Sequence, residues 1–239
     1  MLDDFGAAGL AEWDAIKGEI HMRTSVKTMV ASAVGLIALA VSPNAQQQVL
    51  PLEQQKVSRL PPLPQPLDPI MKAMFDKRRA QGGSIINLQL VTGHAPKFAQ
   101  AASAMAFTIR FHAKTPRKML ELIIMRTAQI AGSQYEINQH IPLSKMCGYS
   151  YAQITALPNW KTSTLFDDKE RAVLGYVEEM AHGGDVDDPT FAALQKYFDP
   201  QEIVEITYTV GSYYANALLT KALRIEPEHD GRETVPGKC

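Results

Sequence analysis

The chain has 239 residues, of which 46% are hydrophobic and 21% are charged, and its formal net charge at pH 7 is −1. This composition is typical of a folded globular protein and excludes a disordered or fibrous chain. Its 24 Lys and Arg residues are scattered rather than clustered. They therefore offer no basic surface for a nucleic acid or an anionic membrane, and we expect neither as a partner.

The N-terminal residues 1–45 are predicted to be an extension and a secretory signal peptide. Arg23 and Lys27 supply a positive start, and an apolar run over residues 29–41 and then small residues follow. The run is shorter than the roughly 20 residues that span a bilayer, so we expect no stable membrane anchor. Export to the periplasm or the medium is predicted, with cleavage after Ala40 or Ala45.

Residues 1–21 lie upstream of the positive segment, where a signal peptide has almost nothing. We therefore expect Met22 to be the true start, within a signal that ends near Ala45. The alternative is an amphipathic leader helix over about residues 10–20.

Residues 46–68 are predicted to be a linker, because they contain three consecutive Gln residues and several prolines that favour extended chain. After them, apolar residues repeat with helical spacing, and no segment has the pattern of a strand. The predicted fold class is all-α, a multi-helix bundle in one domain over residues 69–226, with a loose polar tail over residues 227–239. The predicted helices cover residues 69–80, 96–112, 116–131, 134–146, 150–157, 167–183, 188–198 and 200–223, and a short segment over residues 85–92 follows the first of them.

The two cysteines, Cys147 and Cys239, belong to no CxxC motif and to no His/Cys cluster with the spacing of a zinc site, so we predict no metal site. Spacing alone leaves two alternatives for them. They form a disulfide, or Cys147 is a buried thiol and Cys239 a free thiol in the tail.

The central helices carry the candidate acid and base groups. Glu121 lies on an apolar helical stripe, where burial disfavours a charged carboxylate, so it should be paired or functional. Glu136 and His140 are four residues apart and project from one helix face. Gly132 allows a tight reversal between the two helices, which would bring Glu121 to this pair.

Each of these residues also has a structural explanation. A Glu and a His four residues apart often form a solvated surface contact, and Glu121 could be half of a structural ion pair. Arg126 lies on a different stripe from Glu121, where it could bind a carboxylate or pair with a neighbouring acid.

The segments ELIIMRTAQIAGS, YEINQH and IPLSKMCGYS resemble the core of the carboxymuconolactone decarboxylase and alkylhydroperoxidase-D-like family. The resemblance continues through DDKERAVLGYVEEMA and DPQEIVEITYTVGSYYANALLTKAL and covers about residues 69–226. In the peroxidase branch a CxxC works with a Glu and a His. Here Ser133 and Glu136 match the two cysteines, while Glu121 and His140 match the Glu and the His. CxxC-dependent peroxidase activity is therefore not expected.

The resemblance instead implies the decarboxylase branch, whose members remove CO2 from a carboxylated lactone without a cofactor. It implies His140 as proton donor or shuttle, and Glu121 and Glu136 as the residues that orient it. Arg126, with Tyr135 and Ser133, would bind the small-molecule substrate.

The resemblance also implies a homo-oligomer, a trimer or hexamer, for which the last helix is a candidate interface. Two other functions stay open. One is a cysteine-free oxidoreductase or proton-transfer enzyme with the same site, and the other is a non-catalytic helical binding protein.

Overall fold

The computed structural model describes residues 55–228 and Cys239, and within them every regular element is a helix. The predicted signal peptide and the start at Met22 lie outside the described residues. The all-α prediction is confirmed for the described part of the chain. The elements are α2 (Pro69–Ala80), α3 (Asn87–Thr92), α4 (Pro96–Phe111), α5 (Arg117–Ala131), α6 (Gln134–Met146), α7 (Tyr151–Ala156), the 3-10 turn η2 (Leu157–Asn159), α8 (Asp168–Gly183), α9 (Asp188–Gln195) and α10 (Pro200–Leu223).

Most helices begin where a short polar side chain caps the first turn. In each case the side-chain oxygen accepts a hydrogen bond from a backbone N–H that has no partner within the helix. The capping residues are Asp68, Ser133, Ser150, Asp167, Asp187 and Asp199. The sequence predicted these starts to within a residue or two, because capping is a local interaction.

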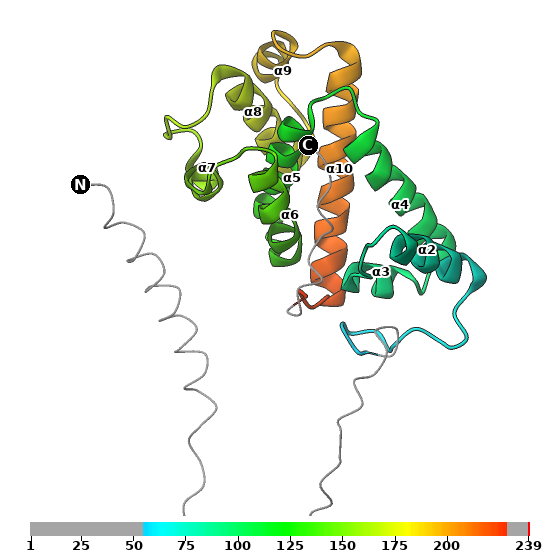
Figure 1. Cartoon of the computed structure of the whole chain (residues 1–239). Coiled ribbons are helices and arrows are strands. Elements are labelled where there is room, and N and C mark those ends of the chain that lie inside the picture. Colours follow the sequence, from blue (N-terminus) through cyan, green and yellow to red (C-terminus); the bar gives the residue numbers. More distant parts are fainter. Residues whose placement is uncertain (1–54, 229–238) are drawn as a thin grey trace, which may run out of the picture. The chain divides into compact units, whose positions relative to one another are not determined.

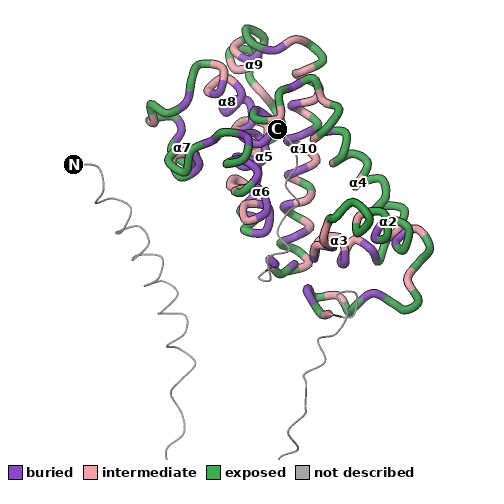
Figure 2. Tube along the Cα trace, viewed as in Figure 1, coloured by how far each residue is buried: buried purple, intermediate pink, exposed green. Residues whose placement is uncertain are grey.

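The long helix α10 runs between two groups of helices (Figure 1). On one side are α5, α6 and α8, and on the other are α2, α3 and α4. Helix α5 is the central element, since it contacts α10, α6 and α8 and 11 of its 15 residues are buried. Figure 2 shows the same concentration of burial along α5 and α6. A carboxylate on α5 therefore lies among the most deeply buried of the described residues.

Of the predicted linker over residues 46–68, the structure describes residues 55–68, and this part packs against the helices. In its described part, Val57 and Leu63 are buried and join a second apolar cluster that is built on α2 and α3. The backbone N–H of Glu226 also donates to the carbonyl of Val57. Prolines keep this chain extended, but the apolar residues between them cover the exposed face of the cluster. Proline content alone does not reveal such packing.

Within the predicted loose tail over residues 227–239, two of the three described residues, Glu228 and Cys239, are bonded to the helical domain. Glu228 is buried and accepts a hydrogen bond from the Tyr135 hydroxyl at 2.9 Å. Cys239 forms a disulfide with Cys147 at the end of α6, with 5.2 Å between their Cα atoms. Of the two alternatives that the cysteines left open, the structure contains the disulfide.

No helix within residues 55–228 is both long enough and apolar enough to cross a bilayer.

Candidate active site between α4, α6 and α10

A tight turn between α5 and α6 builds the site. Gly132 ends α5 in the left-handed conformation, with φ of 67°, which glycine adopts without the steric cost of a side chain. Ser133 then caps α6, and its Oγ accepts from the backbone N–H of Glu136 at 3.2 Å. The two helices therefore reverse direction within two residues, and Glu121 on α5 faces His140 on α6.

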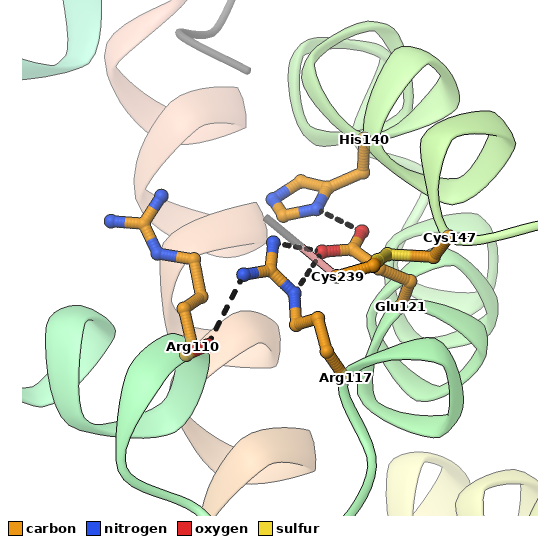
Figure 3. Close-up of a disulfide and its surroundings, with 6 residues drawn as sticks. All are labelled: Arg110, Arg117, Glu121, His140, Cys147 and Cys239. Carbon is orange, nitrogen blue, oxygen red and sulfur yellow. Dashed lines mark hydrogen bonds and ion pairs between the residues drawn. A yellow bond between two sulfur atoms is a disulfide. The ribbon is translucent and has the colours of Figure 1, made fainter. Parts of the chain in front are cut away.

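Glu121 is held from two sides (Figure 3). One carboxylate oxygen, Oε2, lies 2.8 Å from Nδ1 of His140, and the other, Oε1, accepts from Nε of Arg117 at 2.8 Å. Arg117 Nη2 contacts the same oxygen. Glu121 is fully buried and His140 is 6% exposed, so water does not compete for these bonds. The pair fixes the orientation of the imidazole.

The pKa of the Glu121 carboxyl lies below its ordinary value. Burial acts to raise this pKa, but the charges and hydrogen bonds of His140 and Arg117 outweigh burial. Glu121 is therefore ionised and accepts the Nδ1 proton of His140. The second ring nitrogen, Nε2, is not bonded to Glu121 and can interact with a group on the opposite side of the ring.

Glu136 lies on that other side. One of its carboxyl oxygens, Oε2, is 3.8 Å from Nε2 of His140, too far for a direct hydrogen bond. The other oxygen, Oε1, is buried without a hydrogen-bond partner among the described residues. Burial raises the pKa of Glu136 above its ordinary value, Glu228 adds to this increase, and His140 and Arg110 oppose it. Two carboxyls on either side of one imidazole are thus driven toward opposite protonation states.

His140 and Glu136 line a cavity of about 130 Å³. Tyr213 of α10 packs edge-on against the imidazole, with 5.1 Å between the ring centres. Glu121 is not among the lining residues, so it acts from behind His140. Small and apolar residues of α3, of the position just before it, of α4 and of α6 form much of the remaining wall, namely Ile86, Leu88, Ala99, Ala102, Ala106 and Leu143. The cavity thus combines an acid–base pair with an apolar surface for a ligand.

Two arginines that we did not single out from the sequence, Arg78 of α2 and Arg110 of α4, also line this cavity. Both lie on the border of a second, wider groove of about 830 Å³ between α2 and α4. The sequence contains no motif around them. They reach the site only through the packing of α2 and α4, which their local sequence does not show.

Tyr135 and Ser133, predicted to bind substrate, are placed differently from each other. Tyr135 lines the cavity, but its hydroxyl donates to Glu228 and accepts from the backbone N–H of Leu88 at 3.1 Å. The Ser133 hydroxyl is fully buried between the first turn of α6 and Thr220, 2.8 Å away, and does not line the cavity. The hydroxyl groups of Tyr135 and Ser133 therefore form hydrogen bonds that connect α6 to other helices and to the C-terminal segment.

Arg126 lies outside the cavity. Its Nε and Nη2 each donate to one carboxylate oxygen of Glu178 on α8 at 2.8 Å, and its Nη1 donates to Gln129. A guanidinium with such a two-point carboxylate partner is saturated. Of the two alternatives for Arg126, the structure shows the pairing with a neighbouring acid, Glu178, and not a position in the cavity.

No group of three or more His, Cys, Asp or Glu side chains within residues 55–228 and Cys239 has the arrangement of a metal site.

Comparison with known families gives one match. Residues 96–179, from the start of α4 into α8, match the carboxymuconolactone decarboxylase family. This segment contains Glu121, Glu136 and His140. No curated protein matches the sequence.

Several solved structures share the fold. An alkylhydroperoxidase AhpD core protein from Ralstonia eutropha JMP134, described as peroxidase-related, is 16% identical with a TM-score of 0.65, covering 77% of this chain and all of its own. A peroxidase-related protein from Silicibacter sp. TM1040 is 16% identical with a TM-score of 0.65, over 75% of this chain and 96% of its own.

The debrominase Bmp8 is 18% identical with a TM-score of 0.58, over 72% of this chain and 92% of its own. At these identities the likeness establishes the fold alone. Residues 96–179 therefore match the carboxymuconolactone decarboxylase family, and the described helices have the fold of AhpD-like proteins.

Proposed function

We propose that this protein is a cofactor-independent lyase that removes CO2 from a small carboxylated lactone or ring compound by acid–base catalysis. One observation carries the proposal. His140 is oriented through Nδ1 by an ionised, buried Glu121, while its Nε2 faces Glu136 beside the cavity. The family match of residues 96–179 supports the same reaction class.

The opposite pKa shifts of the two glutamates assign the proton. Glu121 is ionised and holds the imidazole, whereas Glu136 favours its protonated form. The proton available for catalysis is therefore assigned to Glu136, on the cavity side.

The reaction needs one bond broken and one proton delivered. The bond between the ring carbon and the carboxylate breaks, CO2 leaves, and the electron pair moves into the conjugated lactone carbonyl. Glu136 or His140 then gives a proton to the resulting carbanion, and solvent restores that proton. The net change is one carboxylate and one proton converted into one C–H bond and CO2, so no external oxidant or reductant is required.

The test is CO2 release from a panel of carboxylated lactones, with 4-carboxymuconolactone included, by the purified protein and by His140→Gln. We expect turnover by the wild type and a loss of about 100-fold or more in His140→Gln, the usual effect of removing a general acid. His182→Gln is the matched control, because His182 is exposed at the end of α8 and lies outside the cavity. Absence of turnover across the whole panel would exclude the decarboxylase function.

We also propose that the protein acts outside the cytosol. The disulfide between Cys147 and Cys239 supports this location, because such bonds persist in oxidising compartments. The signal-like segment from Met22 to Ala45 is the second support.

We further propose that the chain forms a homo-oligomer through α10. Five exposed apolar or small residues follow one another on α10 at alternating spacings of four and three, which places them on one stripe. They are Val204, Tyr208, Gly211, Ala215 and Leu218. Tyr208 is 60% exposed in the single chain, and a stripe of this kind is suited to packing against a second copy.

A further inference from the structure

The guanidinium groups of Arg78 and Arg110 line the cavity, and the one carboxyl among the lining residues is that of Glu136. Arg78 donates from Nε to the carbonyl of Ser84, and Arg110 donates from Nε to the carbonyl of Ala106. Among the described residues neither guanidinium forms an ion pair with a carboxylate. This differs from Arg117 and Arg126, which are both paired. A carboxylate is the usual partner for such a planar guanidinium group.

The charges of Arg78 and Arg110 both act at the cavity that Glu136 and His140 line. Burial lowers the pKa of Arg78, and the nearby charge of Arg110 lowers it further. Arg110 also opposes the rise in the pKa of Glu136. The positive charge of Arg110 therefore interacts with the acid–base pair. Bringing two like charges together in a half-buried cavity costs free energy, and an anion between them would offset this cost.

We propose that Arg78 and Arg110 bind a carboxylate of a small cyclic acid, whose ring lies against Ala102 and Ala106 with its far edge toward His140. The cavity of about 130 Å³ is close to the volume of about 150 Å³ that accommodates benzene. The two alanines lie one turn apart on α4, on the wall of the cavity, and leave room for a flat ring. A carboxylate carried on an apolar ring is favoured over a phosphate, since the ring can lie against the apolar side chains of the wall.

The bound carboxylate is one that the reaction retains. A guanidinium on the departing carboxylate would stabilise the substrate more than the transition state, in which that negative charge has moved into the ring. Arg78 and Arg110 are therefore specificity-determining residues that position the ring, and His140 and Glu136 act at its other edge. This role rests on the proposed lyase function, although the binding itself does not need turnover.

The experiment measures binding of benzoate, a non-reacting ring carboxylate, by calorimetry to the full chain. Benzamide is its neutral counterpart, and inorganic phosphate tests the other anion. We expect benzoate to bind the wild type and to bind Arg110→Gln and Arg78→Gln at least about tenfold more weakly, the usual effect of losing a charge-assisted hydrogen bond. Arg79→Gln is the matched control, because it removes the same charge from α2 at a residue outside both cavities. Arg110→Gln is the primary variant, since Arg110 donates only within its own helix.

Equal benzoate affinity in the wild type and in both arginine variants would overturn the inference. The same holds if the wild type binds no benzoate, binds benzamide as tightly, or prefers phosphate. His140→Gln separates this inference from the lyase function, because it should lose CO2 release while its benzoate binding still depends on Arg110. If benzoate binding depended on the arginines but no lactone were turned over, the carboxylate site would be supported and the lyase function would be contradicted.

Discussion

The Nδ1 atom of His140 and the Oε2 atom of Glu121 lie 2.8 Å apart, although their residues are 19 positions apart in the sequence. Both side chains are buried, and Arg117 holds the other oxygen of the same carboxylate. One buried acid therefore does two things. It fixes the orientation of the imidazole, and it neutralises an arginine within the protein.

Glu121→Gln should weaken both roles. Removing one charge of a buried pair leaves Arg117 unpaired, so we expect the free energy of unfolding to fall by about 3–5 kcal/mol. The folded pKa of Glu121 is below its ordinary value of 4.5, so its contribution to stability is present above that pH and is lost as the pH falls through the folded pKa. Urea unfolding at neutral and acidic pH measures this change.

Glu178→Gln is the control for that variant, because it removes a carboxylate from Arg126 outside the cavity. It should reduce stability and leave CO2 release unchanged. If Glu121→Gln were unstable but fully active, Glu121 would be a structural residue only.

Glu136→Gln should have the opposite effect on stability at neutral pH. Because burial raises the folded pKa of Glu136, its ionisation costs free energy as the pH rises above the ordinary value of 4.5. Glutamine has nearly the same shape and no charge, so the variant should gain about 1–3 kcal/mol relative to the wild type at pH 7 and show no gain at pH 4. Melting curves across this pH range test the sign.

The same Glu136→Gln variant should lose about 100-fold or more in CO2 release, since it no longer carries a proton for the reaction. A more stable variant with unchanged turnover would remove Glu136 from catalysis.

Cleavage of the disulfide should destabilise the folded unit. The bond closes a loop between residues 92 apart in the sequence, and removing such a constraint from the unfolded chain costs about 2–4 kcal/mol. Cys147→Ser and Cys239→Ser should each lower the melting temperature, and a reductant should bring the wild type to the same value. The reductant should have no effect on the double variant. An unchanged melting temperature of the wild type under reduction would contradict this role.

The exposed stripe on α10 predicts the effect of a charge at its centre. Tyr208→Glu should shift the chain to a smaller assembly in light scattering, because a carboxylate in an apolar helix contact remains unpaired. Tyr151→Glu is the matched control, since Tyr151 is also highly exposed but lies on α7. Equal assembly size in the wild type and Tyr208→Glu would place the interface elsewhere.

Local sequence signals were sufficient for the helices and for the proximity of the central acid–base residues. Glu136 and His140 share a face because they are one helical turn apart, and Gly132 permits the reversal that brings Glu121 to them. Sequence reasoning failed for the arginines. A guanidinium can pair with any acid that tertiary packing brings near, so Arg126 could not be distinguished from Arg78 or Arg110 by spacing.

By itself, the sequence determined what depends on near neighbours along the chain, namely the helix starts, the α5–α6 turn and the presence of an acid on an apolar stripe. Only the tertiary structure decided what depends on distant segments. It placed Arg78 and Arg110 at the cavity, paired Arg126 with Glu178, and attached Cys239 to Cys147. The reason is physical, because capping and helical periodicity act within a few residues. Burial and ion pairing depend on which helices pack together.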